Sequence, residues 1–117
     1  MKPALRHTTV WDIILWVCRR YRRFRVTGDS MLPLLSPGCE VLIDPVTYTQ
    51  APPEPGDVVV AHHPQQLGLR IIKRVEFVEP DGRCYLKGDN PSASSDSRQF
   101  GLVSPAQLQG KVLCLFP

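Results

Sequence analysis

The sequence predicts a mostly β protein: a small, coiled antiparallel sheet, or partly closed barrel, with one helix at the N-terminus. Twelve prolines in 117 residues favour short strands and loops over a helix bundle. Short runs rich in β-branched residues recur between turns that contain Gly or Pro, from residue 40 to the end of the chain. The length suits a single domain with a modest core.

The first predicted element is a helix over residues 9–23. Apolar residues recur at helical spacing between Val10 and Val17, and Thr8 or Thr9 can cap the start of the helix. The pattern then changes to short strands. The predicted strands are EVLID (40–44), DVVVAHH (57–63), LRIIKRVEFVE (69–79), RCYLKGD (83–89) and KVLCLF (111–116).

Charge is distributed unevenly along the chain. Residues 1–26 hold seven basic residues and one acidic residue, whereas the remainder holds seven basic and ten acidic residues. We therefore divide the chain into an N-terminal basic helical segment, residues 1–23, and a main domain, residues 24–117. The apolar run in the first segment is nine residues long, and about 20 are needed to cross a bilayer. We expect this segment to pack on the domain; the alternative is a peripheral membrane contact through residues 10–25.

Loops separate the strands. The Pro-rich run QAPPEPGD (50–57) predicts a loop, and PDG (80–82) predicts a hairpin turn. The segment GDNPSASSDSRQF (88–100) is too polar to form a core, and long loops of this kind are usually functional or disordered.

The longest predicted strand places a lysine among apolar residues. Alternate residues of a strand share a face, so Lys73 lies with Ile71 and Val75, whereas Arg74 and Glu76 fall on the other face. Two interpretations stay open. The lysine either extends to solvent at the sheet edge or is buried, in which case desolvation lowers its pKa and favours the neutral amine.

The segment GDSMLPLL (28–35) contains a serine between residues that favour tight turns. This serine, Ser30, is either a loop cap or a nucleophile, and a nucleophilic serine needs a base. No histidine lies in a recognisable catalytic motif, since His7, His62 and His63 have no such surroundings. A lysine can serve as the base, and Lys73 is the lysine whose position suggests a dry environment.

Four segments together resemble the conserved boxes of the signal peptidase I family. These are GDSMLPLL, GDVVV (56–60), IKRV (72–75) and GDNPSASSDSRQFG (88–101), and they occur in the family's order. The resemblance covers residues 26–103. It implies a fold of signal-peptidase type and a serine endopeptidase with a Ser–Lys dyad, in which Ser30 is the nucleophile and Lys73 the general base.

The resemblance also implies supporting roles around the nucleophile. The N–H of Ser30 would bind the oxyanion, flanked by Asp29 and Met31. Gly28 stands where some members have a serine that completes the oxyanion hole, which leaves the second donor open. Two further departures are Leu34, in place of threonine, and Cys39, where the family often has aspartate; we expect this cysteine to be a small packing residue rather than a reactive thiol.

The last box carries four further predicted site residues. By resemblance, Ser94 would orient the lysine amine, Gly88 would leave room for it, and Asp96 and Arg98 would form a supporting ion pair. We predict no metal site and no cofactor. The spacing of the four cysteines, at positions 18, 39, 84 and 114, gives no CxxC pair, so we expect reduced, mostly buried thiols, although a disulfide stays an alternative.

Within this family, the short chain most resembles the maturation protease of nickel-type superoxide dismutase. That resemblance implies a cytoplasmic enzyme that removes an N-terminal propeptide from the dismutase precursor. The alternative is a signal (leader) peptidase that acts at a membrane surface, and a mitochondrial inner-membrane peptidase is disfavoured by the lack of a span. A second alternative is a non-catalytic module that binds peptides or anionic surfaces. We expect no nucleic-acid partner, because the main domain is net acidic.

Overall fold

The structure is a computed structural model that describes residues 5, 8–17, 20–90, 92 and 97–116. The elements in chain order are α1 (Val10–Val17), β1 (Arg22–Arg25), β2 (Glu40–Asp44), α2 (Thr47–Gln50), β3 (Val58–His62), β4 (Arg70–Val78), β5 (Cys84–Lys87), α3 (Ser97–Phe100), the 3-10 helix η2 (Pro105–Gln107) and β6 (Leu108–Leu115).

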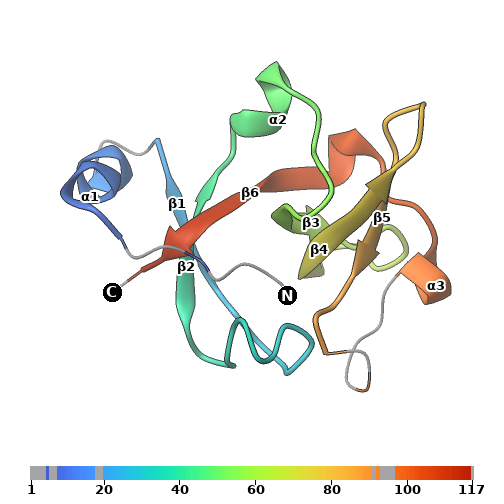
Figure 1. Ribbon diagram of the computed structural model, residues 1–117, viewed down its shortest axis with the longest axis horizontal. Coiled ribbons are helices and arrows are strands. Elements are labelled where there is room, and N and C mark those ends of the chain that lie inside the picture. Colours follow the sequence, from blue (N-terminus) through green and yellow to red (C-terminus); the bar gives the residue numbers. More distant parts are fainter. Residues whose placement is uncertain (1–4, 6–7, 18–19, 91, 93–96, 117) are drawn as a thin grey trace.

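The six strands form one sheet in the order β1-β2-β6-β3-β4-β5, and every neighbouring pair is antiparallel (Figure 1). The mostly β prediction is therefore confirmed. Within the described residues the sheet is not closed into a barrel, because β1 and β5 lie at the two ends of this order. The sheet coils, so that α1 and α3 lie at opposite ends of the molecule (Figure 1).

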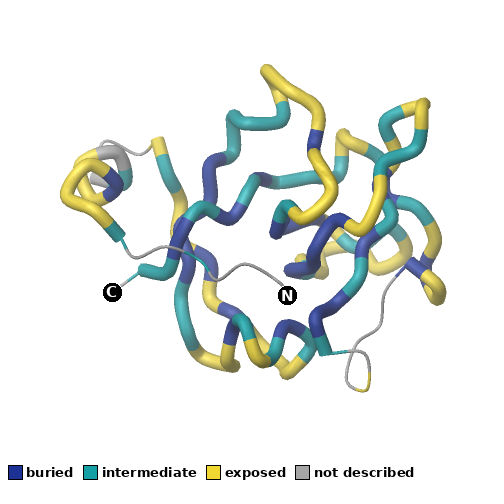
Figure 2. The backbone as a smooth tube through the Cα atoms, in the orientation of Figure 1, coloured by how far each residue is buried: buried dark blue, intermediate teal, exposed yellow. Residues whose placement is uncertain are grey.

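The central strand β3 is buried on both faces, which explains its unbroken run of apolar residues. Val58 and Val60 belong to one core cluster, and Val59 and Ala61 belong to the other. Adjacent residues of a strand point to opposite faces, so this strand joins the two clusters. Buried positions follow the strands, whereas α1 and the loops are largely exposed (Figure 2).

The predicted hairpin between β4 and β5 is present. Gly82 has a φ of 91°, a left-handed conformation that glycine adopts without strain. Its N–H donates to the carbonyl of Glu79 at 2.8 Å and closes the turn. The hairpin positions β5, whose pairing with β4 ends where Lys87 lies opposite Arg74.

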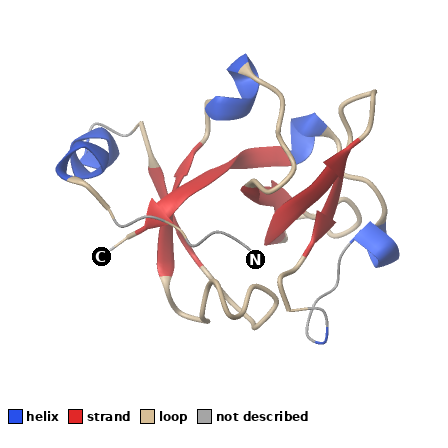
Figure 3. Cartoon of the chain, viewed as in Figure 1, coloured by secondary structure: helices blue, strands red, loops and turns tan. Residues whose placement is uncertain are grey.

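The N-terminal helix is shorter than predicted. It ends at Val17, and the last two residues of the predicted helix, 22 and 23, belong instead to the strand β1 (Figure 3). Phe24 is the buried residue of this strand and packs in the core opposite Val41 of β2. Burial of Phe24 and pairing with β2 thus override the local sequence pattern. The division of the chain at residue 23 stays a prediction.

Three short helical elements were not predicted. Of these, α3 lies inside the segment predicted as a loop and is anchored by two buried residues, Ser97 and Phe100. The other two are α2 and η2. Among the described residues, Cys39, Cys84 and Cys114 form no disulfide. The fourth cysteine, Cys18, lies outside the described residues.

Candidate active site

Ser30 lies in a tight turn between β1 and β2. The turn begins at Gly28, whose φ of 76° favours glycine, and continues through a hydrogen bond of 2.9 Å from the N–H of Leu35 to the carbonyl of Met31. The side chain of Met31 is fully buried in the core, whereas Ser30 is half-buried. The turn thus presents the serine toward solvent while its neighbour fixes it to the core.

Lys73 is buried. It lies in β4 opposite Val59 of β3, and only 5% of its surface is exposed. Of the two interpretations of this lysine, burial is therefore correct. Removal of water disfavours the charged form of an amine and favours the neutral form that a general base needs.

Ser30 and Lys73 line the same cavity, which has a volume of about 180 Å³. The remaining lining residues are Phe24, Thr27, Leu69, Arg70, Ile71 and Ile72. The fold thus brings the candidate nucleophile and the candidate base, which are far apart in the sequence, to one cavity with a mixed polar and apolar lining.

The segment after β5 holds the serine turn in place through Asn90. The N–H of Asn90 donates to the carbonyl of Ser30 at 2.8 Å, and its side-chain Nδ2 donates to the carbonyl of Asp29 at 3.1 Å. We did not predict a role for Asn90. Its position after Gly-Asp in the last box was the one signal in the sequence that could have indicated it.

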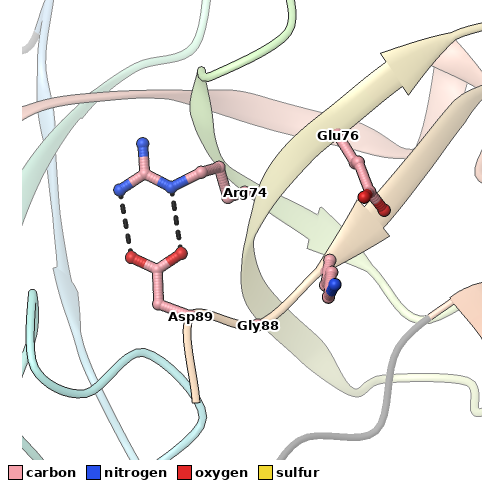
Figure 4. A pocket seen from close by; sticks show the side chains of 5 residues that line it. Arg74, Glu76, Gly88 and Asp89 are labelled. Carbon is pink, nitrogen blue, oxygen red and sulfur yellow. Dashed lines mark hydrogen bonds and ion pairs between the residues drawn. The ribbon is translucent and has the colours of Figure 1, made fainter. Parts of the chain in front are cut away.

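A buried ion pair fixes the same segment to β4. The guanidinium of Arg74 donates to both carboxylate oxygens of Asp89, at 2.9 and 3.0 Å (Figure 4). A third bond joins Arg74 Nη1 to the carbonyl of Gly56 at 2.8 Å. Arg74 is therefore buried, on the strand face opposite Lys73. The pair borders a second cavity of about 140 Å³ that is also lined by Glu76, Lys87 and Gly88.

The predicted supporting residues of the last box are only partly described. Ser94 and Asp96 lie outside the described residues, so their roles stay predictions, as does the role of the buried Gly88. Arg98 lies in α3 and is exposed. Its neighbour Ser97, which was not predicted, is buried and accepts a hydrogen bond of 2.8 Å from the N–H of Leu86 in β5.

The other titratable groups near the sheet have structural roles. Asp57 accepts a hydrogen bond of 2.8 Å from the hydroxyl of Tyr48, and burial together with this carboxylate raises the pKa of Tyr48. Burial and the charge of Asp57 also raise the pKa of the Cys84 thiol to about 11. Cys39 is half-buried against the core, as expected for a packing residue.

Two features are absent from the described part of the chain. No group of three or more His, Cys, Asp or Glu side chains within the described ranges could hold a metal ion. None of the described helices has the length and apolar character needed to cross a bilayer.

Comparison with known proteins relates the chain to membrane peptidases. The family described as Peptidase S24-like matches residues 18–113. Mitochondrial ATP-independent inner membrane protease subunit 1b of Arabidopsis thaliana is 32% identical over 108 residues, which cover 74% of this chain and 64% of the relative. Mitochondrial inner membrane protease subunit 2 of Danio rerio is 31% identical over 124 residues, which cover 88% and 64%.

A bacterial relative is also similar over a shorter stretch. The probable signal peptidase I-1 of Synechocystis sp. is 39% identical over 57 residues, covering 43% of this chain and 29% of the relative. The chain spans slightly less than two thirds of the length of the two mitochondrial relatives, 64% of each.

These relatives correct two expectations from the sequence. The expected cytoplasmic location is wrong, because the mitochondrial relatives are named as inner membrane proteases, which points to membrane association. The expected resemblance to a nickel-dismutase maturation protease finds no support either, since none of the three relatives carries such a name. The resemblance to signal peptidases is supported.

Proposed function

Because this chain belongs to the Peptidase S24-like family, we propose that it is a serine endopeptidase of signal-peptidase type that removes N-terminal leader segments at a membrane surface. The observation that carries the proposal is the shared cavity of Ser30 and Lys73. A hydroxyl and a buried amine at one site are the components of a Ser–Lys dyad.

In the proposed reaction, Oγ of Ser30 attacks the carbonyl carbon of the scissile bond, and Nζ of Lys73 takes up the hydroxyl proton. The lysine passes this proton to the leaving amine, which departs and leaves an acyl-enzyme. Water then attacks the acyl group, and its proton returns through Lys73 to Ser30. The N–H of Ser30 supports the oxyanion in both steps.

The sheet offers an edge for an extended substrate beside this cavity. β5 pairs with β4 from Arg74 to Val78, whereas the preceding residues of β4, from Arg70 to Lys73, line the cavity. These residues pair with β3 on their other side. A substrate could therefore add as a strand at this edge and place its carbonyl next to Ser30.

The membrane part of the proposal rests on the relatives. Two of them are named as inner membrane proteases and one as a signal peptidase. Precursors that carry a leader segment are therefore the first substrates to test, and a nickel-dismutase precursor is the comparison substrate.

The test is cleavage of a leader-bearing precursor in the presence of lipid vesicles, read as intact mass. We expect the wild type to release the leader and Ser30→Ala and Lys73→Ala to leave the precursor intact. Lys73→Arg should also fail, because a guanidinium cannot act as a base at neutral pH. Circular dichroism of each variant verifies that the fold is kept.

Three outcomes would change the proposal. Full activity of Ser30→Ala or Lys73→Ala would exclude the dyad. Cleavage of the nickel-dismutase precursor alone would replace the leader-bearing substrate while keeping the chemistry. Binding of precursor by the wild type and by Ser30→Ala, without cleavage by either, would favour the non-catalytic peptide-binding alternative.

A further inference from the structure

The N-terminal helix α1 is oriented against the usual rule for a surface helix. Its acidic residue, Asp12, is buried with 3% of its surface exposed, whereas Val10 and Trp11 are 75% and 67% exposed. Ile13 and Ile14 are 39% and 42% exposed. A surface helix of a globular protein normally turns its apolar face to the core. This helix turns it outward.

The outward orientation is enforced by specific contacts. The carboxylate of Asp12 accepts hydrogen bonds from the N–H and the hydroxyl of Thr9, both at 2.9 Å, and so caps the start of the helix. The ring of Trp16 packs on Phe116 with 4.8 Å between centroids, and the guanidinium of Arg23 lies 5.6 Å from the Trp16 ring. Rotation of the helix to bury its apolar residues would break the contacts of Trp16 and the contact of 3.8 Å between Asp12 and the thiol of Cys114. The bonds between Thr9 and Asp12 lie within the helix and would rotate with it.

The exposed residues form one continuous face. At 3.6 residues per turn, Val10, Trp11, Ile13 and Ile14 cover an arc of about 160° around the helix axis. Exposed apolar residues are ordinary when scattered, but a contiguous apolar face marks an interaction site. The helix lies at one end of the molecule, next to β1 and far from β4 (Figure 1).

Basic side chains follow the helix directly. Arg22, Arg23 and Arg25 are exposed on β1, and Arg20 precedes them. Arg20 and Arg23 form ion pairs with Asp44 and Glu40, at 3.3 and 2.7 Å, and are therefore partly neutralised. Arg22 and Arg25, at the two ends of β1, are also exposed and add positive charge to the strand that follows the helix.

We propose that the apolar face of α1, together with Arg22 and Arg25, docks on the surface of a bilayer that contains anionic phospholipid. This inference deepens the proposed function by naming the surface that meets the membrane. An apolar helix face next to basic residues is the pattern of an interfacial helix. Eight residues extend about 12 Å, far less than a bilayer core, so the helix lies in the interface.

The basic residues favour lipid over a second copy of the chain as the occupant. A symmetric contact through α1 would bring two arginine-rich strands close together, and like charges repel. Anionic headgroups attract the same residues, at roughly 1 kcal/mol for each basic residue near the surface, and the indole of Trp11 suits the boundary between headgroups and acyl chains.

The test is co-sedimentation of the full chain with vesicles of phosphatidylcholine and phosphatidylglycerol at low and high salt. We expect the wild type to bind these vesicles, and to bind pure phosphatidylcholine roughly tenfold more weakly. The double variant Trp11→Gln/Ile14→Gln and the double variant Arg22→Gln/Arg25→Gln should each lose about tenfold or more in binding. Leu67→Gln is the matched control, because Leu67 is fully exposed in the loop between β3 and β4.

The proposal would be overturned if the wild type did not bind the anionic vesicles. It would also be overturned if the wild type bound them and neither double variant weakened this binding. A dimer in sedimentation velocity that Trp11→Gln/Ile14→Gln dissolves would assign the face to a second copy and also overturn it. Cleavage of a soluble peptide without vesicles separates this inference from the proposed function. Neither double variant should change the rate at which this peptide is cleaved. A wild type that binds vesicles but cleaves no substrate would refute the proposed function and leave the membrane contact in place.

Discussion

The main-chain N–H of Asn90 donates a hydrogen bond of 2.8 Å to the carbonyl oxygen of Ser30. The side-chain Nδ2 of the same residue holds the preceding carbonyl, that of Asp29, at 3.1 Å. One residue after β5 thus fixes two consecutive peptide groups of the turn that carries the candidate nucleophile. Asn90 is therefore a positioning residue for Ser30 in the proposed reaction.

We predict that Asn90→Ala lowers kcat strongly but lowers the free energy of unfolding only slightly. The variant keeps the main-chain bond to Ser30 but loses the bond to Asp29, so the turn gains freedom. Small displacements of reacting groups are costly, and we expect kcat to fall roughly tenfold. The free energy of unfolding should fall by only about 1 kcal/mol, the usual value of one hydrogen bond. Single-turnover cleavage and urea unfolding measure the two effects.

Ser92→Ala is the control for this prediction. Ser92 Oγ donates to Oδ1 of Asn90 at 2.9 Å, and the variant leaves both bonds to the turn in place. Its kcat should stay near that of the wild type. An Asn90→Ala enzyme with an unchanged kcat would show that the turn is held without this side chain.

A second prediction concerns the buried pair Arg74 and Asp89. Their side chains are only 11% and 2% exposed. Removal of one partner leaves an uncompensated buried charge, so Asp89→Ala should lower the free energy of unfolding by about 3–5 kcal/mol. The double variant Arg74→Met/Asp89→Leu should recover part of this loss, because it removes both charges. Urea unfolding of the wild type and the two variants measures this.

The pair Arg83 and Asp81 provides a matched control on the surface. Its N–O distance is 2.8 Å, similar to that of the buried pair, but both side chains are about half exposed. Arg83→Ala should leave the urea midpoint almost unchanged, because exposed ion pairs contribute little. Equal effects at the two sites would mean that burial does not determine the importance of the Arg74 pair.

The strands could be predicted from the sequence because their signal is local. Val58, Val59 and Val60 are consecutive β-branched residues in a run that loop-forming residues bound on both sides. This run forms the strand β3 (Val58–His62). The strand β1 could not be predicted in the same way. Its sequence is RRFR, and Phe24 is the one buried residue in it. Pairing with β2 makes it a strand, and that pairing is a long-range contact.

The candidate site, like the fold, could be predicted only where its signal in the sequence is local. The alternation of residues along β4, which is a local signal, placed Lys73 among apolar residues but left its burial open. The contacts of Asn90 with the serine turn join residues about sixty positions apart, and no periodicity encodes them. Arg74 is buried on the face opposite Lys73, and this burial depends on Asp89, on the neighbouring segment, which provides a partner. Sequence patterns therefore indicated the two candidate residues, whereas the contacts that support them depend on tertiary structure.

A third prediction concerns acid stability and Asp44. Burial alone would raise the pKa of Asp44, but hydrogen bonds from the N–H of Val46 and from the side chains of Arg20 and Thr47, with the charge of Arg20, lower it below the ordinary 3.8. The unfolded chain therefore takes up this proton first as the pH falls. The stabilisation is complete well above pH 3.8 and is lost as the pH falls through the lower folded-state pKa.

Urea unfolding of the wild type and Asp44→Asn across pH 2–6 tests this. The wild type should be more stable than the variant near pH 6, and the difference should shrink below about pH 4. In Arg20→Gln, the pKa of Asp44 measured by NMR should move toward its ordinary value. Parallel curves for the wild type and Asp44→Asn would contradict the prediction.

The last prediction concerns the close approach of β6 to the end of β2 at Gly110. A Cβ atom added to Gly110 would lie 2.7 Å from the carbonyl oxygen of Asp44 and 3.2 Å from Cα of Pro45. Both are backbone atoms at the end of β2, where Asp44 pairs with Lys111 of β6. They therefore cannot move aside as the end of a flexible side chain could. We expect Gly110→Ala to lower the free energy of unfolding by about 1–3 kcal/mol, the usual cost of overpacking.

Gln109→Ala, one residue earlier in β6, is the matched control. It removes a surface bond of 3.4 Å from Arg70 and adds no atom near Asp44. Its unfolding midpoint in urea should stay near that of the wild type. Because Gly110 pairs with Val60 of β3, the clash also strains the central strand, and hydrogen exchange of the Val60 amide should accelerate in Gly110→Ala. If Gly110→Ala kept the hydrogen-exchange rate and the free energy of unfolding of the wild type, the two strands would be able to separate at this point without loss of packing.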